Sequence, residues 1–480
     1  MGQALNFLAK DTEDAARLTR LDDVLARYHH YYKNEIEPGT TRIAHVLDLL
    51  GKPQNKIAPA IHIAGTNGKG SSLAFLQAVL EGEGLRIHKM SSPHLISLHE
   101  RFYVAGKFIE TQDLLDLLEG LEPLYEDNEI SFFEAITAAT FKVFSENEAD
   151  FSLIETGMGG RFDASNVLES PALTMISTIS RDHEAFLGSD IAQIAREKAG
   201  IMKAGVPCII GPQIFPEVYD VFRQEAEEKG APLYCAGQDW FIDNDQNGTA
   251  CLMLEAKYGW PIEESVYVLP ELPLLGQHQY GNAAMALIAA KIILAQKRQE
   301  PVSVASLLGH LSATKWPARM QNLEDHSYHS LVPSQADLWL DGAHNDSAAI
   351  ALAAQIRSWK KVEDCVVYLV VGMINTKTPE SFFAPLRAVI NGIATVPVPT
   401  SWHSYAPQDL LVQACPEADK ACQRLGAYES VEQALEFIAC QHKAQGEQDA
   451  KKKIHIIICG SLYLAGSVLG ADENAKNHFN

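Results

Sequence analysis

A glycine-rich turn beside a lysine is the first feature of this chain that could carry out chemistry. The stretch HIAGTNGKGSS, residues 62–72, follows an apolar run and places Lys69 among three glycines. A strand that leads through such a turn into a helix directs backbone N–H groups and the positive helix end at an anion. Here Gly70 separates Lys69 from the hydroxyl of Ser71, unlike the common phosphate loop. A plain strand-to-helix turn is the alternative, but we expect phosphate binding, with the helix opening at about Ser71.

Two further stretches place chemically useful side chains at the ends of apolar runs. FSLIETGMGGRFDASN carries Glu155 at the end of such a run, before glycines, an arginine and an aspartate. ISTISRDHEAFLG carries Asp182 and His183 in a similar position. Ligand and metal groups gather at the carboxyl ends of strands in α/β proteins. Each residue alone could be an ordinary polar residue, but together they favour a shared site.

The elements that must position these residues alternate between strand-like and helical segments, which predicts an α/β fold with a mainly parallel sheet. Segment 221–275 resembles a small β-rich extension because DNDQNG is a turn signal, and a helix should run from about Asn282 to Gln296. Beyond it, apolar runs near residues 336, 365 and 453 predict a smaller, Rossmann-like α/β domain. We therefore expect two domains, at 1–297 and 298–480.

Composition excludes several classes of partner. The chain has 39 Lys and Arg against 61 Asp and Glu, a formal net charge of -22, which disfavours nucleic acid and anionic membranes. Its apolar runs fall short of the roughly 20 residues that a bilayer span needs, and its first residues lack a secretory pattern. The eight cysteines contain no C-x-x-C pair and indicate reduced, mostly packed thiols. We expect a cytoplasmic monomer that acts on small molecules.

The chain also resembles one enzyme family. GTNGKGS, SSPHL, ETGMGGRFDASN, EKAGI, GQHQYGNAA, WPARMQ and DGAHN occur between about residues 40 and 470, in the order seen in the folylpolyglutamate synthase and dihydrofolate synthase family, the folate branch of the Mur ligase superfamily. The resemblance implies a ligase that uses ATP and magnesium to join L-glutamate to a pteroate or folate carboxylate. That carboxylate would attack the γ-phosphate, and the glutamate amine would then displace phosphate from the acyl phosphate. Metal and basic groups would stabilise the developing charge.

The resemblance assigns nucleotide contacts to specific residues. The loop that would cradle the β- and γ-phosphates consists of Gly65, Thr66, Asn67, Gly68, Lys69, Gly70 and Ser71. Lys69 would lie nearest the transferred group and act in catalysis. Asn282 matches an adenine-reading position, since an amide offers both a donor and an acceptor. Arg319 matches a catalytic arginine that reaches the phosphates, and Asp341 and His344 match ribose and nucleotide contacts. ATP would then bind between the two domains.

Metal ligands are implied in the same way. Ser92, Glu155 and His183 match the family's magnesium ligands, although an imidazole is unusual on magnesium and Ser71 could contribute a hydroxyl instead. Lys198, in REKAGI, resembles a lysine that becomes carbamylated and holds a second magnesium ion. A carbamate would replace a cation with an anion that offers two oxygen ligands. The alternative is a solvated lysine on a helix.

The pterin side of the family's site maps onto two segments. Ser131 and Phe133 lie in ISFFEA, and Asp163 and Ala164 lie in RFDAS. An aromatic side chain can stack on the flat ring, and a carboxylate can pair with its amino-pyrimidine edge. These residues predict a bifunctional enzyme that makes dihydrofolate and also extends folates. On periodicity alone, Phe133 could equally belong to the helix core.

Three positions depart from the family's usual residues. Ala318 occupies a place in WPARMQ where glycine is commoner, Glu184 stands where threonine is frequent, and Lys377 falls where many members carry an acidic and lysine cluster. A cell-wall Mur ligase is disfavoured by SSPHL and because only about 58 residues precede the loop. A nucleotide-binding regulator without catalysis is disfavoured because Lys69 and Glu155 are intact.

Overall fold

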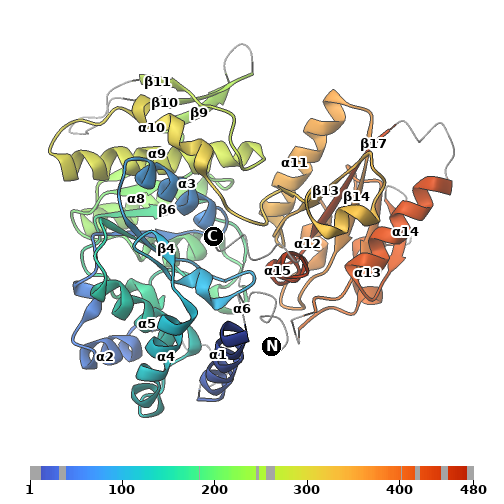
Figure 1. The fold of residues 1–480 in the computed structure, drawn as a ribbon. Helices are drawn as coiled ribbons and strands as arrows, with labels where there is room; N and C mark the ends of the chain where they lie inside the picture. Colours follow the sequence, from blue (N-terminus) through green and yellow to red (C-terminus); the bar gives the residue numbers. More distant parts are fainter. Residues whose placement is uncertain are drawn as a thin grey trace. The chain divides into compact units, whose positions relative to one another are not determined.

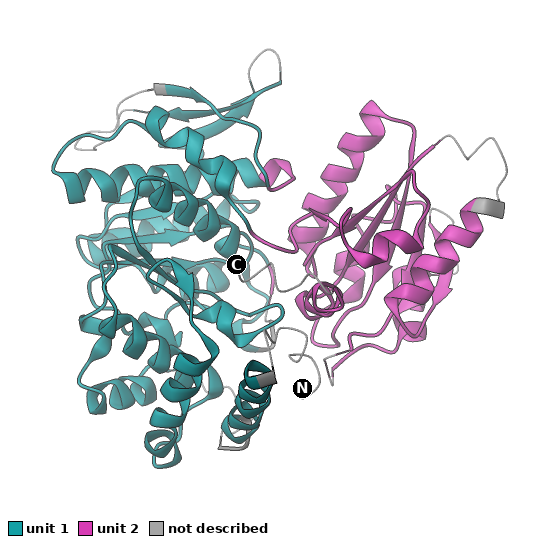
Figure 2. Ribbon diagram, in the orientation of Figure 1, with its two compact units in different colours: residues 1–180, 184–273, 279–315 teal, residues 181–183, 274–278, 316–480 magenta. Residues whose placement is uncertain are grey.

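The computed structural model describes residues 12–31, 39–182, 184–244, 248–255, 265–399, 401, 403–416, 422–444 and 452–472. They divide into two compact units (Figure 2). The first comprises the described residues up to 180 together with 184–273 and 279–315, and the second comprises 181–182, 274–278 and those from 316 onward.

The division after Lys315 differs from the expected boundary at residue 297. Helix α9 (Gln277–Arg298) is followed by α10 (Val304–Leu307) and η5 (Leu308–Ala313), and η5 packs against α3 (Lys69–Gly82). This contact keeps residues 298–315 with the first unit. Helix α9 also begins earlier than the expected Asn282.

An eight-stranded sheet forms the centre of the first unit, where Figure 1 labels β4 and β6. Its strand order is β4-β3-β2-β5-β1-β6-β7-β8. Only β3 (Tyr103–Val104) and the edge strand β4 (Lys107–Phe108) pair in antiparallel fashion. The parallel strands are β1 (Ala60–Ala64), β2 (Ile87–Met90), β5 (Phe151–Glu155), β6 (Leu173–Ile176), β7 (Cys208–Ile210) and β8 (Leu233–Cys235). The predicted, mainly parallel sheet is therefore confirmed.

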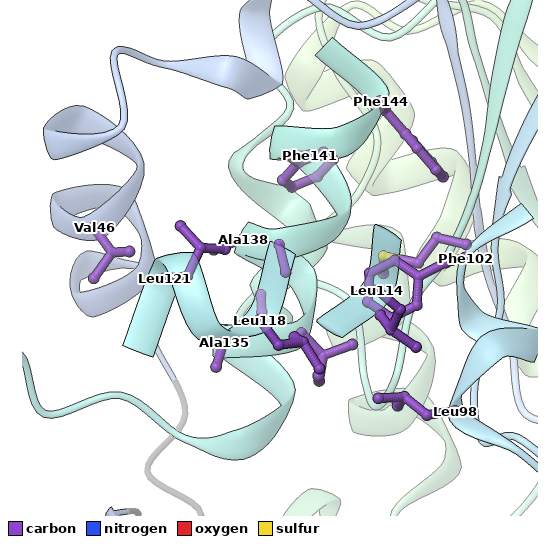
Figure 3. Close-up of a cluster of buried hydrophobic side chains, with 14 of the residues drawn as sticks. Val46, Leu98, Phe102, Leu114, Leu118, Leu121, Ala135, Ala138, Phe141 and Phe144 are labelled. Atoms are coloured by element: carbon purple, nitrogen blue, oxygen red, sulfur yellow. The ribbon is translucent and has the colours of Figure 1, made fainter. Parts of the chain in front are cut away.

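Two apolar clusters cover one face of this sheet. The first contains Ala60 of β1 and packs against α1 (Thr12–Tyr31), α2 (Thr41–Leu49), α4 (Thr111–Glu126) and α5 (Phe132–Glu146). Figure 3 shows Val46, Leu118 and Phe141 within it. The second contains Ala64 and packs against α7 (Ile191–Ala199) and α8 (Glu217–Lys229), which follow the short α6 (Glu184–Leu187). Burial of these apolar faces provides the main driving force for folding.

The expected β-rich extension at 221–275 is only partly correct. Residues up to Lys229 belong to α8, whose buried side chains include Val218, Val221 and Phe222, and β8 joins the main sheet. The separate antiparallel sheet consists of β9 (Trp240–Asn244), β10 (Ala250–Leu254) and β11 (Ser265–Val268).

A six-stranded sheet forms the second unit, in the order β12-β13-β17-β14-β15-β16. Apart from β12, the strands are parallel, as predicted for a Rossmann-like domain. Its strands are β12 (Gln321–Asn322), β13 (Ala336–Leu340), β14 (Cys365–Val371), β15 (Gly392–Thr395), β16 (Gln423–Ala427) and β17 (Lys453–Cys459). Its helices are α11 (Asp346–Val362), α12 (Pro379–Phe383), α13 (Pro407–Ala414), α14 (Val431–Ala444) and α15 (Leu462–Gly470).

Short 3-10 helices connect several elements. They are η2 (Pro53–Asn55), η3 (Leu98–Arg101), η4 (Ala164–Val167) and η6 (Ser327–Leu331). In the part of the chain that the structure describes, the cysteines form no disulfide and all except Cys440 are buried. Among those residues, no helix combines the length and apolarity needed to cross a membrane.

Candidate active site

The glycine-rich turn joins β1 to α3, which begins at Lys69 rather than at the expected Ser71. Glycine is required at two positions. Gly68 has a φ of 91°, and a Cβ there would lie 2.5 Å from Asn282 Oδ1. A Cβ on Gly65 would lie 1.8 Å from Ser177 Oγ. Because the first N–H groups of a helix lack intrahelical acceptors, the start of α3 is suited to bind an anion.

Thr66 and Asn67 brace this loop against the segment that follows β6. Their backbone N–H groups both donate to Thr178 O, at 2.9 and 3.2 Å. Thr66 Oγ1 also donates to Ser180 O at 3.0 Å. These two N–H groups are therefore engaged within the protein, in contrast to the expectation that the whole loop cradles phosphate. The N–H groups of Gly68 to Ser71 are better placed for that task.

Two lysine side chains converge on one carbonyl of the loop. Gly65 O accepts from Lys69 Nζ at 3.1 Å and from Lys198 Nζ at 2.9 Å. Lys198 lies near the end of α7 and is only 4% exposed, so the alternative of a solvated helix lysine is wrong. Lys69 Nζ also lies 3.9 Å from Glu155 Oε1. The phosphate loop, both lysines and the carboxylate thus form one group.

Glu155 and Ser92 meet at the carboxyl ends of β5 and β2. Ser92 N donates to Glu155 Oε2 at 3.3 Å, and Glu155 Oε1 lies 3.9 Å from Lys69 Nζ of the phosphate loop. Ser92 Oγ is buried and has no hydrogen-bond partner among the described residues. A buried hydroxyl without a partner costs free energy, and hydroxyl and carboxylate oxygens suit Mg²⁺. This pair therefore fits a magnesium ion. His183, the third expected ligand, lies outside the described residues.

Asn282 contacts the phosphate loop from α9. Its Oδ1 accepts from Ser72 Oγ at 3.4 Å, and its Nδ2 donates to Gln279 Oε1 at 2.9 Å. Asn282 is buried and lies directly against Gly68. In this structure Asn282 positions the loop, and its contact with adenine stays a prediction.

Two of the expected pterin residues lie at the start of α5, and one of them, Phe133, borders the glycine-rich loop after β5. Ser131 caps the helix: its Oγ accepts from Glu134 N at 3.3 Å, and its N donates to Glu134 Oε2 at 2.7 Å. The Phe133 ring lies against Gly157, where a Cβ would come within 2.5 Å of the ring. Phe133 also packs against the first apolar cluster, so it joins the core and borders the loop. This position is compatible with a role in the helix core and with a role in stacking on a pterin ring.

Asp163 points into the protein. It is 5% exposed, and its Oδ2 accepts from Met158 N at 2.9 Å. Its Oδ1 accepts from Ser165 N at 3.0 Å and from Ser165 Oγ at 2.5 Å. Burial raises the pKa of Asp163, whereas these hydrogen bonds lower it. Asp163 organises its own loop, and its pairing with a pterin edge stays a prediction. Its neighbour Ala164 is buried as well.

Asp341 joins two loops of the second unit. Its Oδ2 accepts from Met320 N at 2.8 Å and its Oδ1 from Ala343 N at 2.7 Å, so DGAHN is tied to WPARMQ. His344 Nδ1 lies 2.7 Å from Gly342 O. The nucleotide contacts expected of Asp341 and His344 stay predictions.

The backbone conformation of Ala318 explains why glycine is commoner at this position in the family. Its φ is 55°, in the left-handed region that favours glycine, and its carbonyl accepts from Arg319 Nη1 at 2.8 Å. The sequence analysis did not single out His278, an exposed residue in the first turn of α9. The charges of Asp341 and Arg319 act on its ring in opposite directions. In the sequence, only its position inside the family motif GQHQYGNAA could have indicated that His278 lies near the site.

Lys377, which departs from the family pattern, forms an ion pair with Asp182. Asn345 Nδ2 also donates to Asp182 Oδ2 at 3.4 Å, and His344 Nε2 lies 3.5 Å from the same oxygen. Lys377 therefore positions the segment immediately before His183.

A separate group of possible metal ligands is formed by Glu363, Cys365 and His455, whose donor atoms lie within 4.8 Å of one another. Hydrogen bonds already occupy the imidazole. Trp339 Nε1 donates to His455 Nδ1 at 3.2 Å, so Nε2 carries the ring proton and donates to Glu363 Oε1 at 2.8 Å. The ring then has no lone pair to offer a metal, and we assign no metal centre there.

Two family models match the chain. The Mur ligase middle domain matches residues 63–290, and the dihydrofolate synthetase C-terminal domain matches residues 324–471. A Bacillus subtilis protein named dihydrofolate synthase/folylpolyglutamate synthase is 32% identical over 382 residues, which cover 78% of this chain and 84% of the relative. The chain belongs to the dihydrofolate synthase/folylpolyglutamate synthase family.

Solved structures of this family share the fold. Mycobacterium tuberculosis folylpolyglutamate synthase complexed with ADP is similar with a TM-score of 0.79 and 27% identity, over 97% of this chain and 98% of the other. E. coli FolC in complex with DHPP and ADP has a TM-score of 0.75 and 25% identity, over 94% and 96%. A bifunctional folylpolyglutamate synthase/dihydrofolate synthase with Mn, AMPPNP and L-glutamate bound has a TM-score of 0.74 and 26% identity, over 94% and 97%. Membership makes this protein an ATP-dependent ligase that uses a divalent metal.

Proposed function

We propose that this enzyme adds L-glutamate to dihydropteroate, forming dihydrofolate, and to folates, forming polyglutamates. The observation that carries the proposal is the convergence of Lys69 and Lys198 on Gly65 beside Glu155. The Lys69 cation at the start of a helix, next to a carboxylate, suits the transfer of a phosphoryl group, and Lys198 lies against the same carbonyl. Membership of a family named for both activities supports the two substrates.

The substrate carboxylate is a poor electrophile until it is phosphorylated. One of its oxygens attacks the γ-phosphorus, the bond to the bridging oxygen breaks, and ADP leaves. The N–H groups at the start of α3 and the Lys69 ammonium hold the γ-phosphoryl group and offset its charge. The glutamate amine then attacks the acyl carbon, loses a proton and displaces inorganic phosphate. Ser92 Oγ and the Glu155 carboxylate would hold a Mg²⁺ ion that supplies further positive charge to the phosphates.

Lys198 is proposed to become carbamylated. Its amine is buried beside the phosphate loop, and a lysine amine in its neutral form can attack carbon dioxide to form an N–C bond with loss of one proton. After incubation with ¹³C-bicarbonate, a ¹³C resonance typical of a carbamate should appear in the protein and be absent from Lys198→Ala. Equal spectra for the two proteins would contradict this assignment.

We propose that Phe133 contributes to the pterin pocket. Its ring lies against Gly157 and therefore borders the loop that leaves Glu155. An aromatic face there can stack on a flat heterocycle. We also propose that the enzyme is a cytoplasmic monomer, which its acidic composition and packed thiols support.

The two activities can be separated in one assay. Purified protein is incubated with ATP, Mg²⁺ and L-glutamate, with either dihydropteroate or tetrahydrofolate, and phosphate release and product mass are followed. Glutamate-dependent phosphate release with both acceptors is the expected result. Extension of tetrahydrofolate without any reaction of dihydropteroate would refute the dihydrofolate synthase activity and leave the folate-extending one.

A further inference from the structure

His62 lies in the middle of β1, three residues before the phosphate loop, and is fully buried. Side chains alternate along a strand, so His62 shares a face with Ala60 and Ala64. Ala60 belongs to the first apolar cluster and Ala64 to the second. His62 therefore occupies the boundary between the two clusters.

A chain of hydrogen bonds leads from His62 to the loop after β5. His62 Nε2 lies 2.8 Å from Ser165 Oγ, and Ser165 Oγ donates to Asp163 Oδ1 at 2.5 Å. Since the single hydroxyl proton goes to the carboxylate, Ser165 Oγ accepts from His62, and Nε2 carries the ring proton. Asp163 Oδ2 accepts from Met158 N at 2.9 Å. We call His62, Ser165 and Asp163 the His62 chain.

Packing alone does not account for a histidine at this position. His62 Nδ1 is buried and has no hydrogen-bond partner among the described residues. A buried nitrogen without a partner lowers stability, and a leucine would fill the same apolar surroundings without that cost. The contribution of the histidine is the proton that it donates to Ser165.

The loop at the end of the His62 chain, residues 156–163, touches three groups of the site. It continues directly from Glu155, and its Gly157 lies against the Phe133 ring. Its Gly160 approaches the end of α7 so closely that a Cβ there would lie 2.8 Å from Lys198 O. A shift of this loop would therefore disturb the substrate side of the site.

We propose that His62 is a positioning residue, which holds the loop 156–163 in place for the pteroate or folate substrate through Ser165 and Asp163. The identity of that substrate rests on the proposed function. Because Thr66 and Asn67 are braced separately by Thr178, loss of the His62 chain should affect the pteroate or folate substrate more than ATP.

Two variants and a matched control test this role. His62→Leu removes the donor, whereas His62→Gln retains an N–H that can reach Ser165. His88→Gln is the control, because His88 is also fully buried in this sheet but both of its ring nitrogens have partners, Asn147 O at 3.0 Å and Ala105 N at 3.0 Å. The KM for each substrate, kcat and the urea midpoint of unfolding are measured for every protein.

His62→Leu should unfold at or above the wild-type urea concentration, and its KM for the pteroate or folate substrate should rise about tenfold while its KM for ATP stays within about twofold. His62→Gln should recover most of the loss. His88→Gln should unfold at lower urea with both KM values unchanged. Unchanged KM values in His62→Leu, an equal rise for ATP, or no recovery in His62→Gln would overturn the proposal.

Amide exchange separates this inference from the proposed function. The Met158 N–H donates to Asp163, so its exchange in the ligand-free protein should be about tenfold faster in His62→Leu and close to wild type in His62→Gln. Equal exchange in all three proteins would refute the His62 chain whether or not the protein ligates glutamate. A wild-type protein that ligates no glutamate, but shows the expected exchange, would refute only the proposed function.

Discussion

Folding stability should fall in mild acid because His62 is buried in its neutral form. Burial lowers the pKa of His62 from its ordinary value of 6.5 to about 3, and the positive charge of Lys203 adds to this. Between these values the unfolded chain binds a proton that the folded protein excludes, so the free energy of unfolding decreases as the pH falls below 6.5. The contribution of neutral His62 to the free energy of unfolding is fully present above pH 6.5. Between pH 6.5 and pH 5 the free energy of unfolding decreases by about 2 kcal/mol.

Urea unfolding at about pH 7.5 and about pH 5 measures this effect. His62→Leu cannot bind the proton, so its free energy of unfolding should decrease by about 2 kcal/mol less than that of the wild type over this interval. Other buried histidines, such as His88, whose pKa burial also lowers, contribute equally to both proteins and cancel in the difference. The same pH dependence in wild type and His62→Leu would refute the reasoning.

Three further predictions concern the phosphate loop and its surroundings. Lys69→Ala should lower turnover at least tenfold, about 1.4 kcal/mol of transition-state stabilisation, and near wild-type phosphate release would contradict its assigned role. Gly65→Ala should weaken ATP binding, because its Cβ would lie 1.8 Å from Ser177 Oγ; calorimetry should show partial recovery when Ser177→Gly is added, and full affinity in the single variant would count against this geometry. Burial lowers the pKa of Lys89 from 10.5 to about 8, so the folded protein excludes a proton that the unfolded chain binds between these values, and stability rises with pH there. Lys89→Met should therefore raise the unfolding free energy at pH 7 by up to about 3 kcal/mol and flatten the dependence above pH 8, whereas an unchanged profile would show that the fold does not lower the pKa of Lys89.

The central strands of the eight-stranded and six-stranded sheets could be predicted because their buried apolar runs are continuous and end in glycines or turns. The runs that contain Glu155 and Leu340 are examples, since each forms a strand where it was expected. The expectation failed for residues 221–229, because α8 carries many charged residues and its buried side chains are few. The expected position of the boundary between the two units also differed from the structure, because the contact between η5 and α3 joins segments that lie far apart in sequence.

The group formed by Lys69, Glu155 and Ser92 could be predicted because the carboxyl ends of neighbouring parallel strands lie at one edge of the sheet. The roles of Thr66 and Asp163 could not be predicted from the sequence. Both depend on hydrogen bonds whose geometry follows from strand register and loop path, and neither is encoded in residue type alone. An aspartate suits a ligand contact and a loop brace equally well, and only the structure shows that Asp163 accepts from its own loop.

The central claim is that the substrate carboxylate is phosphorylated by ATP before glutamate is joined to it. The most direct measurement uses dihydropteroate labelled with ¹⁸O in its carboxylate, together with ATP, Mg²⁺ and L-glutamate, and determines the mass of the product and of the released phosphate. With both carboxylate oxygens labelled, our account predicts dihydrofolate that retains one ¹⁸O atom in its new amide carbonyl, and one ¹⁸O atom in each phosphate released. Dihydrofolate formed with unlabelled phosphate, or ATP hydrolysis without any glutamate-containing product, would contradict it.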